Sequence, residues 1–287
     1  MALNARLAYL IPLAASLLAS APSSAASLTS LVAAAPSVGA AGNFAVLAGT
    51  AVTCTNGTIT GNVGVSPGTA ITQTSCPVTG TINAGNAAAV QANSDFFIAY
   101  DKFKALACDR TLTTLDGQTL SPGVYCFDAA ATSAGGVLTL DGPANGIWIF
   151  KIGTLGTGAL TGTGFSVVTP SGAPPPCNSV YWWVAEAATM TDSKFVGSIL
   201  AGAAVTLTRG TFNGDAFAKA GATITGTAVT GCAIGSASPP SCKDRDKDKC
   251  KCECKDKDKD KKHADDDECD DDEHDSDNHQ GKHEEKR

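Results

Sequence analysis

A repeat with a period of 17 residues constrains the fold of this chain more than any other feature. Its three copies begin at Ala188, Val205 and Ala222, and each opens with the pattern Thr-apolar-Thr. A Phe or Val and then a Gly follow at matching places in every copy. A fixed period of this length is typical of a solenoid, because each repeat can bury its apolar face only against its neighbours. We therefore expect stacked coils.

The Thr-apolar-Thr pattern alternates as a β-strand does, so successive side chains point to opposite faces. We expect Met190, Leu207 and Ile224 to point into the coil and the threonines to point outward. Seventeen residues at about 3.3 Å each give a perimeter of about 56 Å, enough for three short sides. Stacking then predicts two parallel threonine columns on one flat face, namely Thr189, Thr206 and Thr223 beside Thr191, Thr208 and Thr225.

Further strands are predicted upstream of the repeat, together with one helix. The apolar or alternating segments are 123–127, 137–140, 146–152 and 181–187. The Ala-rich segment 83–107 differs, because its apolar residues Phe96, Tyr100, Phe103 and Ala107 follow the spacing of an amphipathic helix. We expect the aromatic stripe of this helix to pack along the coils. The predicted fold class is mostly β: a parallel β-helix or solenoid with one long α-helix (about 84–107) packed alongside.

The first residues have the form of a secretory signal peptide, which we place at 1–26. Arg6 precedes an apolar run, Leu7–Leu18, and the small residues Ser24, Ala25 and Ala26 form a cleavage site. The run is shorter than the about 20 residues that a membrane-spanning helix needs. We expect a linker at 27–41, a folded domain at 42–235, and a secreted mature protein without a membrane segment.

The last residues, 236–287, are expected to form a disordered tail rich in Lys, Asp and Glu. Residues 243–287 hold 13 of the 21 basic and 19 of the 28 acidic side chains, and they contain almost no core-forming residues. The preceding chain is therefore close to neutral. Nucleic-acid binding requires clustered Lys and Arg, so we expect no nucleic-acid partner.

Six cysteines precede the tail, an even number that indicates disulfides in an exported chain. Nearest-neighbour pairing would give Cys54–Cys76, Cys108–Cys126 and Cys177–Cys232, although six cysteines allow many other connectivities. None has CxxC spacing, and no histidine precedes the tail, so no zinc site is expected there. In the tail, Cys250, Cys252 and Cys254 with His263 fit either a soft-metal site or oxidised cysteines. We favour the latter and predict no metal site.

Catalytic chemistry finds little support in the sequence. The four histidines, at 263, 274, 279 and 283, all lie in the tail, which excludes a Ser-His-Asp or Cys-His site before it. Glycosidases need a pair of carboxylates. Asp192 and Asp215 occupy different positions in the repeat, so adjacent coils offer no such pair. We predict that the chain is not an enzyme and has no cofactor.

Seven further segments stand out in order along the chain: GNFAVLAG (42–49), GNVGVSPG (61–68), GTINAG (80–85), LSPGVY (120–125), IWIFKIG (147–153), CNSVYW (177–182) and FVGSILA (195–201). With these segments the chain resembles one known family, the microbial ice-binding (antifreeze) proteins. The resemblance covers about residues 40–234. It implies a discontinuous right-handed β-solenoid with a helix alongside, which adsorbs to ice through one flat face, causes thermal hysteresis and inhibits ice recrystallisation.

Some members of this family carry a Thr-small-x-Thr/Asn pattern on the ice-binding face. Here the matching windows begin at Thr161, Thr191, Thr208 and Thr225. The candidate ice-binding residues are therefore Thr161, Thr163, Thr189, Thr191, Thr206, Thr208, Thr211, Thr223, Thr225 and Thr227. Asp192, Lys194 and Arg209 fall inside these windows and break the second column. We accordingly expect moderate rather than strong ice binding, by a monomer whose partner is the ice crystal surface.

Other interpretations stay open. Outward threonine ladders also stabilise parallel stacks without any ligand. The chain could be a cell-surface structural or adhesion protein, with a rigid solenoid and a charged tail that binds cations or cell wall. A glycan-binding or glycan-cleaving β-helix is a third hypothesis, which exposed aromatic side chains would favour. Asn56-Gly-Thr58 is a glycosylation sequon on a predicted loop.

Overall fold

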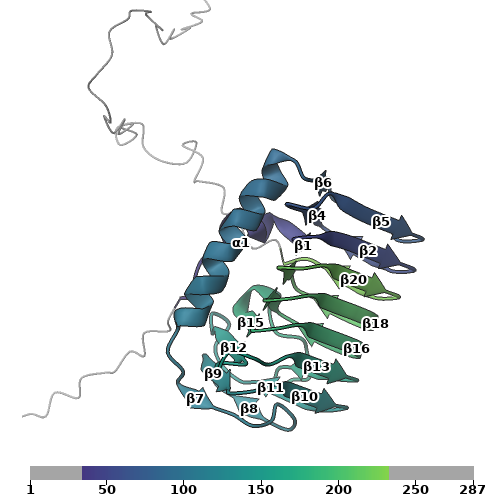
Figure 1. The fold of residues 1–287 in the computed structure, drawn as a ribbon. Helices are drawn as coiled ribbons and strands as arrows, with labels where there is room; N and C mark the ends of the chain where they lie inside the picture. Colours follow the sequence, from purple (N-terminus) through teal and green to yellow (C-terminus); the bar gives the residue numbers. More distant parts are fainter. Residues whose placement is uncertain (1–33, 233–287) are drawn as a thin grey trace, which may run out of the picture. The chain divides into compact units, whose positions relative to one another are not determined.

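The computed structural model describes residues 34–232, and these form a solenoid of stacked coils with three strand-lined faces and one long helix (Figure 1). The predicted signal peptide and the predicted tail lie outside the described residues. All strand pairings are parallel. This architecture agrees with the mostly β solenoid and single long helix expected from the sequence.

Face A is a sheet of nine strands on the side of the helix. In stacking order its strands are β6 (Ile82–Ala84), β4 (Asn62–Val65), β1 (Phe44–Ala48), β19 (Ala216–Ala218), β17 (Ser198–Ala201), β15 (Val180–Val184), β12 (Trp148–Ile152), β9 (Gly123–Phe127) and β7 (Arg110–Thr111). Two short 3₁₀ helices, η1 (Gly39–Asn43) and η2 (Cys177–Ser179), lead into β1 and β15.

Faces B and C share two long strands, β16 (Ala188–Val196) and β18 (Val205–Asn213), which bend from one face to the other. Face B contains their first halves with β5 (Ala70–Thr74), β2 (Ala51–Thr55), β20 (Ala222–Thr225), β13 (Leu160–Thr163) and β10 (Ala131–Ala134). Face C contains their second halves with β3 (Thr58–Thr60), β21 (Ala228–Thr230), β14 (Ser166–Val168), β11 (Val137–Leu140) and β8 (Thr119–Leu120).

The order of the coils in the stack differs from their order in the chain. The first coil, β1–β3, lies between the second coil, β4–β5, and the last coil, β19–β21. After β6, the helix α1 (Ala87–Ala105) carries the chain to the opposite end of the stack, where β7 begins. The 19 residues of α1 span about 28 Å, close to six coil spacings of about 4.8 Å.

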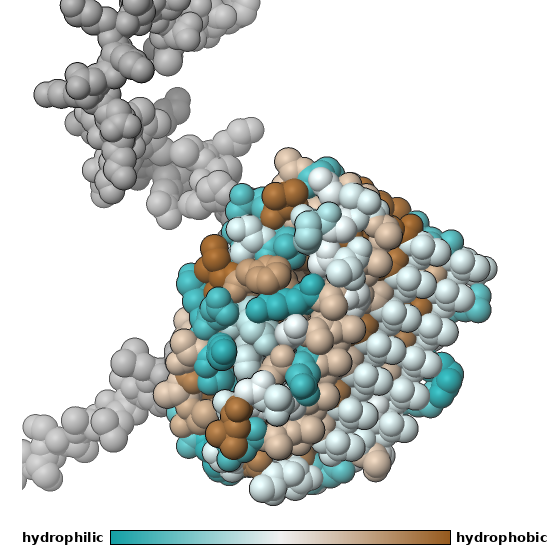
Figure 2. Space-filling model, viewed as in Figure 1, coloured by the Kyte–Doolittle hydropathy of each residue, from teal (hydrophilic) through white to brown (hydrophobic). Residues whose placement is uncertain are grey.

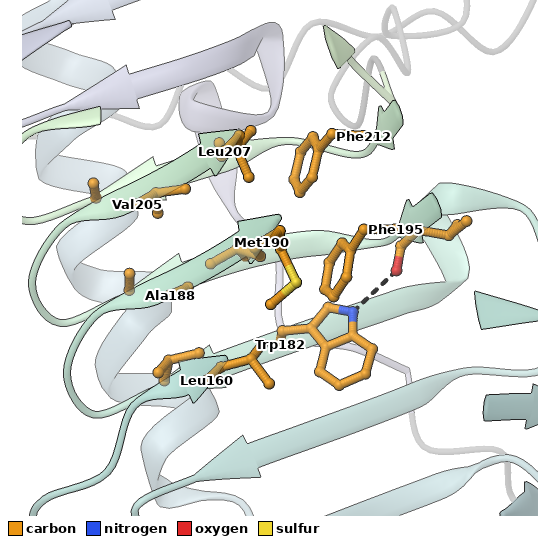
Figure 3. Packing of buried hydrophobic residues seen from close by; sticks show 14 of the residues in the cluster. Leu160, Trp182, Ala188, Met190, Phe195, Val205, Leu207 and Phe212 are labelled. Atoms are coloured by element: carbon orange, nitrogen blue, oxygen red, sulfur yellow. Dashed lines mark hydrogen bonds between the residues drawn. The ribbon is translucent and has the colours of Figure 1, made fainter. Parts of the chain in front are cut away.

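Aromatic and aliphatic side chains fill the interior of the coils (Figure 3). Phe150 stacks on Trp182 with ring centroids 4.1 Å apart, and Phe195 stacks on Phe212 at 5.5 Å. The indole nitrogen of Trp182 donates a hydrogen bond to the carbonyl oxygen of Val196, 3.0 Å away. As the repeat predicted, Met190 lies in this core, with Leu207 and Ile224 in neighbouring coils.

Helix α1 packs on face A through its aromatic stripe. Phe96 contacts Phe217, with ring centroids 5.7 Å apart, and Phe103 contacts Tyr181 at 5.1 Å. The Tyr100 hydroxyl donates a hydrogen bond to the carbonyl of Val184, 3.1 Å away. These contacts bury one side of α1 against the strands.

Ala107 was predicted to belong to the buried stripe of the helix, and this is wrong. Helix α1 ends at Ala105, and Ala107 is exposed beyond its end. Leu106 adopts an extended conformation, and the buried Lys151 ammonium group donates a hydrogen bond to its carbonyl. This turn brings Cys108 to its partner Cys126. At the other end, the Asn86 side chain accepts a hydrogen bond from the amide of Ala89 and so caps the helix.

The three disulfides follow the nearest-neighbour prediction: Cys54–Cys76, Cys108–Cys126 and Cys177–Cys232. The first ties the first coil to the end of the second, and the last ties η2, just before β15, to the end of the described chain. Disulfides of this kind are typical of an oxidising compartment. Within residues 34–232, no helix is long and apolar enough to cross a membrane.

Candidate functional site

Face B carries two columns of aligned threonines, which we call the threonine array. The register pairs β10, β13, β16, β18, β20, β2 and β5 in succession. The first column contains Thr132, Thr161, Thr189, Thr206, Thr223, Thr53 and Thr72. The second contains Ala134, Thr163, Thr191, Thr208, Thr225, Thr55 and Thr74. Thirteen of the fourteen positions are therefore threonine, in seven consecutive coils.

The array is regular because each strand is anchored by a residue between its two outward positions. In β16, β18 and β20 these residues are Met190, Leu207 and Ile224, which are at most 3% exposed. Outward positions two residues apart lie about 6.7 Å apart, and neighbouring coils lie about 4.8 Å apart. Each array position is half-buried or exposed. Figure 2 shows this side of the solenoid as even rows of side chains with intermediate hydropathy.

A turn with positive φ ends the array along one side. In each of the seven coils, the residue after the second column has φ between 50° and 72°. These corner residues are Gly135, Gly164, Asp192, Arg209, Gly226, Asn56 and Ser75. Glycine adopts this conformation freely, and Asn and Asp tolerate it better than most residues, whereas Arg and Ser rarely do. The shared conformation places every corner at the same point and keeps the edge of the array straight.

Asp192 and Arg209 form an ion pair along this corner. The Arg209 Nε and Nη2 atoms donate hydrogen bonds to the two carboxylate oxygens of Asp192, at 2.6 and 2.7 Å. The hydrogen bonds from Arg209 lower the pKa of the Asp192 carboxyl, and the same contact raises the pKa of Arg209. The two charges therefore neutralise each other beside the array.

Asp192, Lys194 and Arg209 were predicted to interrupt the second threonine column, and that placement is wrong. Asp192 and Arg209 lie at the corner, and Lys194 lies on face C, where it pairs in register with Ser166 and Thr211. In the windows that begin at Thr191, Thr208 and Thr225, the fourth residue lies beyond the corner, on face C. In the window that begins at Thr161, the fourth residue, Gly164, is itself the corner residue. The second column is instead the position two residues after the first column.

Eight of the ten candidate threonines lie in the array, and two do not. Thr211 is exposed on face C, paired with Ala228. Thr227 is only 2% exposed, and its hydroxyl contacts the carbonyls of Thr225 and Arg209 at 3.3 and 3.4 Å. Thr227 therefore supports the corner and offers nothing to a surface ligand.

Five threonines of the array were not predicted from the sequence: Thr53, Thr55, Thr72, Thr74 and Thr132. Thr53-Cys-Thr55 and Thr72-Gln-Thr74 carry the same Thr-x-Thr pattern as the repeat. They escaped notice because they precede α1, far from the clear repeat. Their coils join the array only through the pairing of β2 with β20.

The array itself is uncharged, and the strongest perturbation of a carboxyl lies elsewhere. Burial raises the pKa of Asp215 to about 7, although its carboxylate accepts hydrogen bonds from the Cys232 amide and the Ser198 hydroxyl. Asp215 lies directly before β19 and is fully buried. The described residues 34–232 contain no group of three or more His, Cys, Asp or Glu side chains placed to hold a metal ion.

The chain is similar in sequence and structure to proteins that bind ice. The family model described as ice-binding-like matches residues 46–230. An ice-binding protein from Nostoc sp. (strain HG1) is 36% identical over 171 residues, which are 57% of this chain and 61% of that protein. The chain thus spans about three fifths of the length of this relative.

Solved structures of ice-binding proteins have the same fold. One, from the Antarctic ascomycete Antarctomyces psychrotrophicus, is 31% identical, with a TM-score of 0.62 over 69% of this chain and 98% of that chain. Another, from an Antarctic biological consortium, is 32% identical, with a TM-score of 0.64 over 70% and 92%. The names of these matching proteins describe them as ice-binding proteins. The chain belongs to the ice-binding-like family.

Proposed function

We propose that this chain is a secreted antifreeze protein that adsorbs to ice through the threonine array on face B. Adsorption there produces thermal hysteresis and inhibits ice recrystallisation. The observation that supports this proposal best is the register, which aligns thirteen threonines in two uninterrupted columns over seven coils. Family membership supports the same ligand.

The chemistry of threonine suits a surface of ordered water. Each side chain presents a methyl group, which restricts the motion of neighbouring water, and a hydroxyl group, which anchors it by a hydrogen bond. In a rigid two-dimensional lattice, these anchored waters have fixed spacings in both directions. A water layer with such spacings can merge with the ice lattice.

Rigidity and neutrality of the array strengthen the proposal. Because Met190, Leu207 and Ile224 are buried beneath the array, its backbone is fixed before binding, and little conformational entropy is lost at the ice surface. No array position carries a charge that would orient water differently. The nearest charges, Asp192 and Arg209, are paired with each other at the corner.

The test is a bulky substitution at the centre of the array. Thr208→Tyr places a ring above the flat face, so we expect thermal hysteresis to fall at least several-fold while folding is retained. Thr119→Tyr is the matched control, because Thr119 is an exposed threonine of β8 at the far end of face C. Hysteresis that is equal in both variants and in the parent protein would exclude face B as the ice-binding surface. A folded parent protein without hysteresis or recrystallisation inhibition would reject the proposed function.

The adhesion hypothesis depends on the charged tail, which lies outside the described residues. Exposed aromatic side chains would favour the glycan hypothesis, but Trp148, Trp182 and Trp183 are at most 3% exposed. We therefore propose ice as the partner of the solenoid, and we propose that the solenoid acts as a monomer.

A further inference from the structure

Face C carries a second, smaller set of polar outward positions, on strands β18, β21 and β3. The second half of β18 pairs with β21, and β21 pairs with β3. The outward residues of these three strands are Thr211, Asn213, Ala228, Thr230, Thr58 and Thr60. We call these six positions the second array. None is charged, and four are threonine.

The second array is supported in the same way as the first. Between its two columns lie Phe212, Val229 and Ile59, each at most 1% exposed. The ring of Phe212 stacks on Phe195 of the next coil, with centroids 5.5 Å apart. These anchors fix the backbone under the outward side chains, as Leu207 and Ile224 do on face B.

The two arrays are continuous through one strand but face different directions. β18 runs without interruption from Thr206 and Thr208 to Thr211 and Asn213. Between the two pairs, Arg209 and Gly210 have φ values of 57° and 87°, which turn the strand around the corner. Because the turn lies inside a paired strand, the angle between the arrays is fixed. A single flat ice plane therefore cannot contact both.

The remaining part of face C has a different surface, which limits the second array to three coils. Lys194 and Val196 of β16 and Val168 of β14 occupy the corresponding register positions, and Val196 is only 3% exposed. The loop 169–176 adjoins them, and Gly172 and Pro174 help to form a groove of about 360 Å³. Thr211, Asn213 and Thr230 of the second array line the opposite edge of this groove. A charge, apolar side chains and a raised loop make this part unlike a flat lattice of hydroxyl groups.

We propose that the second array is an additional ice-contact surface, so that one molecule binds two non-parallel sets of ice planes. This inference rests on the proposed function, and it extends that function from one plane to two. The occupant is ice because the second array continues the first through β18, shares its Thr-rich uncharged chemistry and stands on the same rigid coils. Its smaller size predicts that the second set of planes binds less protein than the first.

The test uses the full chain, labelled with a fluorophore at its N-terminus and adsorbed to single-crystal ice hemispheres. The parent protein should label two sets of planes. Thr230→Tyr, in the second array, should remove one set and keep the other, whereas Thr208→Tyr should remove the complementary set. The matched control Thr119→Tyr should label as the parent does. Circular dichroism and the melting temperature establish that each variant is folded.

The outcomes separate the two hypotheses. If the parent labels one set of planes that Thr230→Tyr leaves unchanged and Thr208→Tyr removes, the second array is not an ice-contact surface and the proposed function stands. The inference is also overturned if Thr230→Tyr and Thr119→Tyr weaken labelling of every plane equally. A folded parent protein that labels no plane overturns both the inference and the proposed function.

Discussion

Thr53 and Thr223 are direct partners in the pairing of β2 with β20, although they belong to the first and last coils of the chain. Thr55 and Thr225 are paired in the same way. This join makes one array from two segments that α1 separates in the sequence. The five missed threonines extend the array beyond the 17-residue repeat at both of its ends.

The join predicts that threonines before α1 contribute as much as those of the repeat. Thr53→Tyr should reduce thermal hysteresis by a factor similar to that of Thr206→Tyr, because both residues stand in the first column with neighbours on either side. Nanolitre osmometry at equal protein concentrations measures the effect. Full hysteresis in Thr53→Tyr beside a loss in Thr206→Tyr would show that ice contacts only the repeat.

The corner residues predict that glycine can replace the ion pair without loss of ice binding. Glycine already occupies this corner in three coils, and it removes the strain of about 1–3 kcal/mol that a positive φ imposes on Asp192 and Arg209. An ion pair as exposed as this one contributes little to stability. The double variant Asp192→Gly/Arg209→Gly should therefore keep its hysteresis and show an equal or higher free energy of unfolding in urea.

A β-branched residue at the same corner provides the contrast. Arg209→Val should have a lower free energy of unfolding than the parent protein, because a side chain branched at Cβ disfavours positive φ more strongly than the unbranched Arg side chain does. The same urea titration measures it. Equal stability of the glycine and valine variants would contradict the role given to the left-handed corner.

Asp215 predicts a stability that falls as pH rises. Burial raises its folded pKa from 3.8 to about 7, so the protonated carboxyl favours the folded state. The stabilisation is complete below the unfolded pKa and is lost between pH of about 4 and about 7, by about 1 kcal/mol per pH unit at most. Asp215→Asn should flatten this part of the profile of melting temperature against pH. An unchanged slope in the variant would assign it to other groups.

The Cys54–Cys76 disulfide predicts a stabilised end of the array. Cys54 lies inward between Thr53 and Thr55 and is fully buried. A loop with a sequence separation of 22 residues corresponds to a stabilisation of about 3 kcal/mol. Cys54→Ala/Cys76→Ala should lower the melting temperature by several degrees, and hydrogen exchange should rise first in β5. Uniform exchange throughout the solenoid would instead indicate that the coils unfold as a single unit.

The solenoid, the helix and the disulfide pairing could be predicted because each depends on local patterns. The repeat exposes the strand alternation of Met190, Leu207 and Ile224, and the spacing of Phe96, Tyr100 and Phe103 exposes the buried side of the helix. The end of α1 was predicted less well. It depends on Lys151 and on the Cys108–Cys126 bridge, which come from elsewhere in the chain.

The array could be predicted only in part, because its columns depend on two facts that the sequence hides. One is the pairing of the first coil with the last, which brings Thr53 beside Thr223. The other is the left-handed conformation of Asp192 and Arg209, which are not glycines and gave no sign of a corner. Without the corner, Thr211 and Lys194 were assigned to face B instead of face C.

The length of helix α1 must match the number of stacked coils, and therefore the length of the proposed ice-binding surface. Because α1 joins the two ends of the stack, a further coil inserted between β16 and β18 would separate the anchor points of the helix by about 4.8 Å. At about 1.5 Å per residue, α1 would need about three more residues to reach. Extending the surface by duplication of the 17-residue unit thus requires a matched insertion in a distant part of the chain, so coil number and helix length must change together.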